Sequence, residues 1–233
     1  MEKSIKKIFL NYNIELNNLQ EKQFEAYYEF LIEENQKYNL TAITEFNDVI
    51  EKHFIDSVIP YKNIQQNAKI IDVGTGAGFP GVPLKILRPD LDVTLIDSLN
   101  KRINFLNELI KKLDLKNISA VHTRAEDFCA KNREKFDFSM SRAVARTNTL
   151  AEYLLPFVKK GGYALFYKSQ DIEEEINEGK FAIKTLGGKI EKIENFEINN
   201  NKRALVFVKK ISNTPNIYPR GKNLPKTKPL MEK

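Results

Sequence analysis

The chain has 233 residues, of which 42% are hydrophobic, and a net charge of +6. This length suits one well-buried core with a small extension and excludes two large independent domains. The single cysteine, Cys129, excludes an internal disulfide, and no apolar run approaches the ~18 residues of a membrane span.

The remaining composition predicts a soluble, cytoplasmic protein without a metal centre. His53, His122 and Cys129 are widely separated and in no ligand spacing, so a zinc or iron–sulfur site has little to be built from. The first residues are charged, unlike the apolar start of a signal peptide. No spare apolar helix face stands out, so we expect a monomer that does not bind membranes.

The positive charge is concentrated at the C-terminus. Residues 1–68 have a balance of −4, residues 69–208 a balance of +4, and residues 209–233 a balance of +6. A basic, proline-rich segment cannot bury much apolar surface but is able to lie along phosphates. We therefore expect a basic C-terminal arm over 211–233 that binds RNA; the alternative is a solvated tail.

The first part of the chain predicts helices. Apolar residues recur at helical spacing from Ser4 to Lys37, an Asn- and Thr-rich loop follows at 38–44, and Asp48 to Ile59 predicts another helix that Pro60 stops. Residues 1–68 are therefore interpreted as an N-terminal helical cap.

From Lys69 the pattern changes to alternating strands and helices, which predicts an α/β domain over 69–210. Asn199, Asn200 and Asn201 predict the turn of a terminal antiparallel hairpin. The predicted strands are 70–73, 91–97, 118–122, 136–141, 162–167, 190–198 and 204–208, with a helix at 101–113.

A glycine turn follows the first predicted strand and predicts a nucleotide-like cofactor site. Gly74, Gly76 and Gly78 remove side chains where the backbone turns and approaches a ligand. Glycines alone do not separate a dinucleotide fold from a methyltransferase. Asp72 completes an Asp-x-Gly-x-Gly-x-Gly arrangement that resembles motif I of class I methyltransferases. Asp97 ends the second predicted strand, where a carboxylate can accept hydrogen bonds from both ribose hydroxyls. The alternatives are that Asp72 is an ordinary turn residue and that Asp97 only terminates the strand.

Two further strand ends contribute candidates. Arg124-Ala125-Glu126 follows the third strand, where this fold contacts adenine, although acidic residues also favour a helix start. Ser141-Arg142-Ala143 follows the fourth strand in place of the Asp/Asn-Pro-Pro-Tyr/Phe of amine methyltransferases. Cys129 has no Pro-Cys context and is interpreted as a buried small side chain. Targets that need no proton removed, such as guanine N7, remain among the possible substrates.

Several motifs in this order resemble the RsmG (GidB) family over nearly the whole chain. They are Tyr38-Asn39-Leu40-Thr41, His53-x-x-Asp56-Ser57, Asp72 to Gly81, Asp97-Ser98-x-x-Lys101-Arg102, Arg124-Ala125-Glu126, Ser141-Arg142-Ala143 and Tyr218-Pro219-Arg220. The resemblance implies a class I S-adenosylmethionine-dependent fold, a Rossmann-like, mostly parallel seven-stranded sheet with an antiparallel last strand. It also implies methylation of guanine N7 in the decoding-region loop of 16S ribosomal RNA, on free RNA or on the small subunit.

The resemblance also implies site residues. Cofactor contacts are expected at Gly74, Gly76, Gly78, Phe79, Asp97, Ala125, Glu126 and Arg142. RNA contacts are expected at Lys101, Arg102, Arg146, Arg220, Lys222 and Lys226. Arg142 is the candidate catalytic residue, and no general base is expected. The alternative is that Arg142 is an exposed arginine at the start of a helix.

His53 and Asp56 share one helix face and either close over the site or make local hydrogen bonds. Two other functions stay open from the residues alone. A nicotinamide-dependent oxidoreductase accounts for the glycines and Asp97, but not for the helical cap. A ribosome-binding module without activity accounts for the basic arm, but not for the intact glycine turn.

Overall fold

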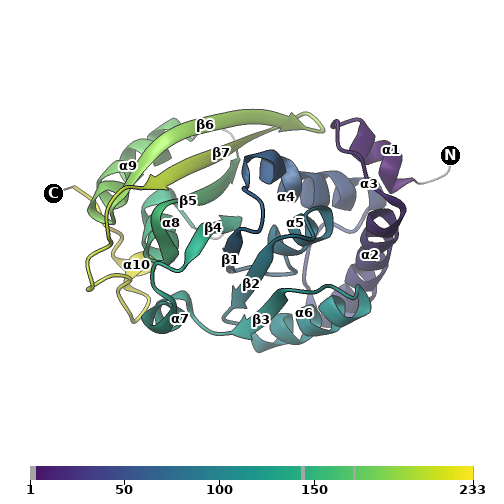
Figure 1. Cartoon of the computed structure of the whole chain (residues 1–233), viewed down its shortest axis with the longest axis horizontal. Helices are drawn as coiled ribbons and strands as arrows, with labels where there is room; N and C mark the ends of the chain where they lie inside the picture. The colour runs from purple at the N-terminus through teal and green to yellow at the C-terminus, as the bar shows by residue number, and fades with distance from the viewer. Residues whose placement is uncertain (1–3, 143–144, 170–171, 233) are drawn as a thin grey trace.

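A computed structural model describes residues 4–142, 145–169 and 172–232. Its centre is a seven-stranded sheet in the order β3-β2-β1-β4-β5-β7-β6, with helices on both faces (Figure 1). The strands are β1 (Lys69–Val73), β2 (Asp92–Asp97), β3 (Ile118–His122), β4 (Phe136–Arg142), β5 (Val158–Ser169), β6 (Gly188–Ile198) and β7 (Asn201–Lys210).

Strand directions confirm the predicted sheet. Strands β1 to β5 pair in parallel, whereas β7 runs antiparallel to both β5 and β6. Asn199 and Asn200 both have positive φ, at 48° and 57°, so the β6–β7 hairpin has the tight turn that paired asparagines favour. Because β1 to β4 are parallel, their carboxyl ends lie along one edge of the sheet, where ligands bind in this fold class.

Alternate strand residues face two separate cores. Ile70 and Leu165 pack with the N-terminal helices and with α5 (Gly81–Leu87) and α6 (Asn100–Lys112). Ile71 and Phe166 point the other way, toward α7 (Ala125–Asn132), α8 (Thr147–Leu154) and α9 (Glu173–Thr185). This double burial explains the nearly continuous apolar runs of the central strands.

The N-terminal region is helical, as predicted, but its helices are shorter. The segment 11–17 divides the predicted helical region Ser4 to Lys37 into two helices, because Asn13 takes a left-handed φ of 57° and Asn17 caps the next helix through its side chain. The expected helix 48–59 lies within a continuous helical run, 46–63, that changes between α-, π- and 3-10 helical geometry. The elements are α1 (Ile5–Leu10), α2 (Asn18–Tyr38), α3 (Phe46–Val49), the π-helix η1 (Ile50–Ile55), α4 (Asp56–Val58) and the 3-10 helix η2 (Ile59–Asn63).

Helix α2 is bound to the sheet domain by polar contacts as well as by apolar packing. The Gln20 amide donates to the carbonyls of Ile86 and Leu87 at the end of α5, at 3.2 and 3.1 Å. The Tyr27 hydroxyl donates to the Ala77 carbonyl in the glycine turn, at 2.5 Å. Position 27 therefore connects the cap directly to the predicted cofactor site.

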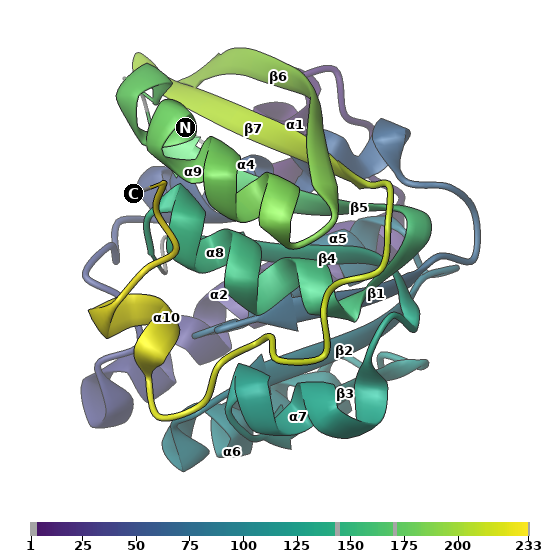
Figure 2. The ribbon, with the colours of Figure 1, turned by 90° about the vertical axis from the view of Figure 1, so that its left-hand side faces the viewer.

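The C-terminal segment differs from the expected free arm. Figure 2 shows it leaving β7, passing the end of α8 and then running between α7 and α8 before it reaches α10 (Leu224–Thr227). Thr214 and Pro225 are buried in this packing. Prolines in the segment restrict the chain to turns that follow the surface, so it buries part of itself without forming a long helix or strand.

No helix in the described parts of the chain is long and apolar enough to cross a membrane. Cys129 is buried on α7, as expected for a small apolar side chain.

Candidate active site

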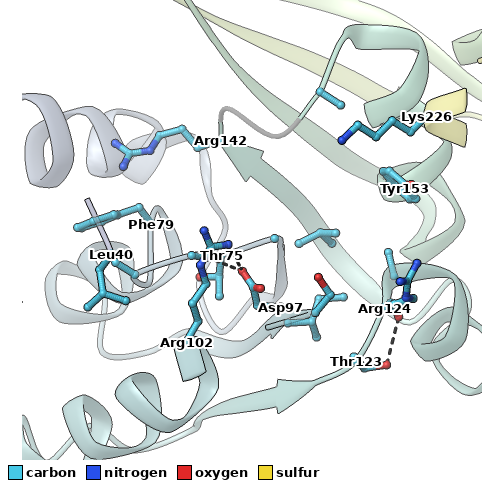
Figure 3. A pocket seen from close by; sticks show the side chains of 18 of the residues that line it. Leu40, Thr75, Phe79, Asp97, Arg102, Thr123, Arg124, Arg142, Tyr153 and Lys226 are labelled. Carbon is cyan, nitrogen blue, oxygen red and sulfur yellow. Dashed lines mark hydrogen bonds and ion pairs between the residues drawn. The ribbon is translucent and has the colours of Figure 1, made fainter. Parts of the chain in front are cut away.

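A pocket of about 730 Å³ lies at the carboxyl ends of β1, β2 and β4. Figure 3 shows its side chains converging from the glycine turn, from the ends of the strands and from the C-terminal helix α10. Its lining residues include Thr41, His53, Gly74, Gly76, Phe79, Asp97, Arg102, Ala125, Glu126, Arg142, Tyr153, Asn223 and Lys226. Seven of the eight predicted cofactor residues therefore line one pocket.

The glycine turn forms one wall. Gly76 has a φ of 63°, and a Cβ built on it would meet no atom within 4 Å, so this backbone borders open space in the pocket. Gly78 is the predicted cofactor residue that does not line the pocket. A Cβ there would lie 2.8 Å from the Tyr27 hydroxyl and from Val82, so its missing side chain leaves room for the helical cap.

Asp72 supports the turn from beneath and does not line the pocket. Its Oδ2 accepts hydrogen bonds from Thr75 Oγ1 at 2.7 Å and from the Gly81 amide at 2.9 Å. Its Oδ1 has no partner among the described residues. Complete burial raises the pKa of Asp72 to about 7, against the two hydrogen bonds that lower it. Asp72 thus shapes the turn and touches the pocket only through it.

Asp97 ends β2 and presents its carboxylate to the pocket. Its Oδ2 accepts from the Gly76 amide at 3.0 Å and from the Arg102 guanidinium at 3.1 Å, and its Oδ1 accepts from the Leu99 amide at 2.9 Å. These contacts fix the carboxylate orientation while leaving further lone pairs for ligand hydroxyls. Its position fits recognition of a ribose diol.

The start of α7 supplies the next side of the pocket. Ala125 and Glu126 lie in its first turn, where the N-terminal end of a helix favours negative charge. The nearest charge to Glu126 is Arg124, with 4.0 Å between their side-chain atoms. Glu126 thus lies at a helix start and also lines the pocket, and its contact with adenine stays a prediction.

Arg142 ends β4 and its side chain is only 14% exposed, so it is not an exposed arginine at a helix start. Its Nη1 donates to Asp56 Oδ2 at 3.0 Å and to the Lys52 carbonyl at 2.9 Å, and its Nη2 lies 3.0 Å from His53 Nδ1. The guanidinium also covers the ring of Phe79, 4.8 Å from its centre. Its Nε–H and one Nη2 hydrogen have no partner among the described residues, so they remain available to a ligand.

The π-helix η1 makes this arrangement possible. Its i→i+5 bonding widens the turn, and π-helical turns are frequent at functional sites. The backbone carbonyls of Lys52 and His53 both accept hydrogen bonds from Arg142. The His53 carbonyl also accepts a hydrogen bond from the Ser57 hydroxyl. The helical run that contains the predicted Asp48–Ile59 helix extends from Phe46 to Asn63 and includes a π-helix, which spacing alone does not reveal.

His53 both makes local hydrogen bonds and lies against the site. Its Nε2 is 2.8 Å from Thr41 Oγ1, and its ring stacks on Phe79 with 4.6 Å between centres. Burial, assisted by the charge of Arg142, lowers the pKa of His53 to about 3. The ring is therefore neutral near pH 7, with Nδ1 accepting from Arg142 and Nε2 carrying the proton.

Asp56 joins two arginines from different strands. It is hydrogen-bonded to Arg142 of β4, and its Oδ1 lies 3.6 Å from Nε of Arg203 on β7. Burial raises the pKa of Asp56, while both arginines act in the opposite direction. Sequence analysis did not single out Arg203, because nothing local to β7 indicates that it meets residue 56.

The predicted RNA-contacting residues fall into two groups. Arg102 and Lys226 line the pocket. The other four lie outside it, and three of them are occupied. Lys101 donates to the Tyr38 carbonyl at 2.8 Å, Arg146 pairs with Glu178 at 2.6 Å, and Arg220 pairs with Glu152 at 2.7 Å, while Lys222 is exposed.

Other pocket residues were missed. Tyr153 and Asn223 line the wall next to Lys226, and Tyr27 holds the glycine turn. Thr41 belongs to a motif noted in the sequence, and its contact with His53 explains that motif. Tyr153 and Asn223 carry no recognisable local signal, since their positions depend on how the C-terminal segment passes α8.

The residues present fit S-adenosylmethionine. The open cradle at Gly76 admits a ligand close to the backbone, Asp97 suits a ribose diol, and Arg142 retains donors for a carboxylate. Within the described ranges, no group of three or more His, Cys, Asp or Glu side chains is arranged to hold a metal ion.

Comparisons with known proteins agree on a family. A family model described as rRNA small subunit methyltransferase G matches residues 20–206. A ribosomal RNA small subunit methyltransferase G from Lachnoclostridium phytofermentans is 53% identical over 226 residues, covering 94% of this chain and 93% of the relative. Another, from Desulforamulus reducens, is 52% identical and covers 89% of each chain.

Solved structures support the fold. TYW2 of M. jannaschii in complex with AdoMet superposes with a TM-score of 0.58 at 19% identity, covering 73% of this chain and 80% of that one. A SAM-dependent methyltransferase from Aquifex aeolicus gives 0.52 at 18% identity, covering 76% and 97%. At these identities the likeness concerns the fold alone.

Proposed function

The chain belongs to the rRNA small subunit methyltransferase G family, and from this premise we propose how its pocket serves the family reaction. That reaction transfers a methyl group from S-adenosylmethionine to N7 of a guanine in 16S ribosomal RNA. The observation that carries the proposal is the combination of the open glycine cradle with Asp97 at the carboxyl edge of the sheet. The anchored Arg142 lies across the same pocket.

The cofactor is held by backbone and carboxylate contacts. We assign the backbone at Gly74 and Gly76 to its closest approach, Asp97 to the ribose hydroxyls, and Ala125 and Glu126 to the adenine end. S-adenosylmethionine supplies, when bound, a methyl group activated by its sulfonium. The negative Asp97 and Glu126 lie in the same pocket and favour a cationic ligand.

The chemistry of the target nitrogen determines which roles the remaining pocket residues need to have. Guanine N7 has a free lone pair and carries no hydrogen, so the reaction needs alignment and a water-poor pocket and no general base. His53 fits this requirement, because it is neutral and its ring nitrogens are already hydrogen-bonded. We assign the free N–H donors of Arg142 to a carbonyl oxygen of the base or to the cofactor carboxylate.

The RNA chain itself is assigned to basic residues, of which Arg102 and Lys226 line the pocket. Lys101, Arg102, Arg146, Lys222 and Lys226 remain the proposed contacts, whereas the pairing of Arg220 with Glu152 gives Arg220 another role. We further propose that the protein acts in the cytoplasm on the RNA or on the small subunit. We also propose that it acts as a monomer, because its exposed large apolar side chains, such as Leu10, Leu19 and Ile217, lie on separate elements.

The division of the chain into 1–68, 69–210 and 211–233 is kept as a functional proposal. Residues 1–68 and 211–233 each contribute to the pocket that the central domain frames, through His53 and through Lys226. The helical cap also shares its core with the central domain, since Phe24 and Leu106 belong to one apolar cluster. The three parts are therefore proposed to act together on one substrate.

Calorimetric titration tests the cofactor assignment. We expect S-adenosylhomocysteine to bind and NAD to show no heat of binding at the same concentrations. Binding of NAD alone would favour a nicotinamide-dependent oxidoreductase. Transfer of labelled methyl to ribosomal RNA excludes a ribosome-binding module without activity.

A further inference from the structure

The C-terminal segment 212–232, called the strap here, is fastened to the domain at several points. Arg133 at the end of α7 donates to the carbonyls of Thr214, Pro215 and Tyr218, at 2.7, 2.8 and 2.6 Å. Thr149 of α8 donates to the Pro225 carbonyl at 2.9 Å. These contacts hold the strap by its backbone, so its course does not depend on a binding partner.

One ion pair joins the strap to α8, and its carboxylate partner is buried. Glu152 of α8 is fully buried, and both of its oxygens accept from Arg220, at 2.9 Å from Nε and 2.7 Å from Nη2. The Arg220 amide adds a third contact to Glu152 at 2.8 Å. A two-pronged guanidinium–carboxylate pair fixes direction as well as distance, which a lysine does not reproduce.

Past this pair the strap enters the pocket. Asn223 turns the chain with a φ of 59°, α10 follows, and both Asn223 and Lys226 line the pocket wall beside Tyr153. Figure 3 shows the Lys226 amine directed into the pocket from the side opposite Arg102. Glu152 and Tyr153 are consecutive on α8, so the residue that holds the strap adjoins one that lines the site.

Lys226 differs from the other cations of the pocket. Arg102, Arg124 and Arg142 each lie within 4.0 Å of a carboxylate, at Asp97, Glu126 and Asp56. Lys226 is exposed and, within the described ranges, has no ion-pair partner. An unpaired ammonium at the mouth of a pocket is available to an anion that enters with the substrate.

We propose that the strap is a built part of the substrate site, in which the Arg220–Glu152 pair positions Lys226 to bind an RNA phosphate next to the methylated guanine. This inference rests on the proposed function and adds a substrate contact and a positioning device to it. Arg220 touches no phosphate in this arrangement. Fixing a flexible lysine on an anchored segment lowers the entropy lost when the phosphate binds.

The salt dependence of RNA binding tests the Lys226 contact. We expect Lys226→Ala to raise the KM for small subunits roughly tenfold, and to lower the slope of log affinity against log salt by about 1, as for one lost phosphate contact. Binding of S-adenosylhomocysteine should stay within twofold. Lys228→Ala is the matched control, because Lys228 is an exposed lysine of the same strap that does not line the pocket.

The positioning role is tested without leaving a buried charge alone. The double variant Arg220→Ala/Glu152→Ala removes both partners and should reproduce the effect of Lys226→Ala on KM and on the salt slope. Adding Lys226→Ala to this double variant should then change the salt slope no further. Arg220→Lys should restore the slope only in part, since it keeps the charge but loses the two-pronged geometry.

The outcomes separate this inference from the proposed function. If the wild type methylates small subunits and Lys226→Ala keeps its salt slope, or Lys228→Ala loses as much, the Lys226 contact is wrong. If the triple variant loses a further unit of slope beyond the double variant, Lys226 binds its phosphate independently of the Arg220–Glu152 pair and the positioning role is wrong. If the wild type transfers no methyl group to RNA, the proposed function fails first.

Discussion

The two sides of the pocket are assembled from different kinds of sequence. The side that we assign to the cofactor, called the cofactor side here, consists of Gly74, Gly76, Asp97, Ala125 and Glu126, each at or just after the end of a parallel strand. The outer wall consists of Thr41, His53, Arg142, Asn223 and Lys226, of which only Arg142 belongs to such a strand. The cofactor side follows from the topology of the sheet, whereas the outer wall requires the cap and the strap to pack correctly.

This difference predicts different consequences of mutation. Changes on the cofactor side should act on cofactor affinity with little effect on the fold, because those residues border open space. Changes at Thr41, His53 and Arg142 of the outer wall should act on stability, because these residues hold one another through polar contacts, and changes at the exposed Lys226 should act on RNA binding.

The largest effect is expected for Gly76→Val, which should abolish measurable cofactor binding and activity. The added side chain would enter the pocket, and the φ of 63° adds backbone strain of about 1 kcal/mol. Gly161→Val is the matched control, since Gly161 also has a positive φ and open space around a Cβ but does not line the pocket. Calorimetry with S-adenosylhomocysteine measures the binding of both variants, and thermal melting measures their stability. An equal loss of binding in the two variants would contradict the role of Gly76 in the cofactor site.

Arg142→Ala should lower the free energy of unfolding by about 3 kcal/mol, because Asp56 is then left buried without its main partner. Arg142→Gln combined with Asp56→Asn should cost less, since no unpaired charge is buried. Urea denaturation measures the difference. Unchanged stability of Arg142→Ala would show that the outer wall does not depend on this pair.

Asp97→Ala should weaken S-adenosylhomocysteine binding about 10- to 100-fold, which corresponds to roughly 1.4 to 3 kcal/mol. The ribose loses its acceptor, and the Gly76 amide loses its partner. Asp92→Ala, an exposed carboxylate at the other end of β2, should leave affinity unchanged. A comparable loss in both variants would place the ribose elsewhere.

Two further effects concern the pH dependence of stability, the first of them on the outer wall. The pKa of His53 is lowered from 6.5 to about 3 in the folded chain, so the unfolded chain binds a proton more readily between these values. The stability that neutral His53 contributes is present above pH 6.5 and is lost as pH falls toward 3. His53→Gln should flatten this acid-side decline in urea titrations, and a decline as steep as in the wild type would contradict the assignment.

Asp72, which supports the glycine turn of the cofactor side, gives a pH dependence of stability with the opposite sign. Its pKa is raised to about 7 in the folded chain from 3.8, so the folded chain binds the proton more readily in that range. Its contribution is fully present below pH 3.8 and is lost as pH rises through about 7. Asp72→Asn should remove this loss on the neutral side, which urea titrations from pH 4 to 8 measure.

The same comparison explains what sequence analysis achieved. The strand order, the antiparallel β7 and the placement of Gly76 and Asp97 depend on periodicity and on the ends of parallel strands, both of which are local signals. Gly78 was assigned to the cofactor because it belongs to the same motif. The structure shows that its space is taken by Tyr27, which lies 51 residues earlier in the chain.

The outer wall was predicted less well because its contacts are distant in sequence. Arg203 meets Asp56, and Glu152 meets Arg220, without any local pattern that indicates either pair. Composition correctly described the C-terminal segment as basic and proline-rich. It did not reveal that Arg133 and Thr149 would hold the segment against α7 and α8.

The most direct test of the whole account is to map the methylated nucleotide. The protein is incubated with labelled S-adenosylmethionine and with small ribosomal subunits from cells that lack it, and the labelled base is then identified. The account predicts a single 7-methylguanine in 16S ribosomal RNA. Label on an exocyclic amine or a ring carbon, or no label with correctly folded protein, would contradict it.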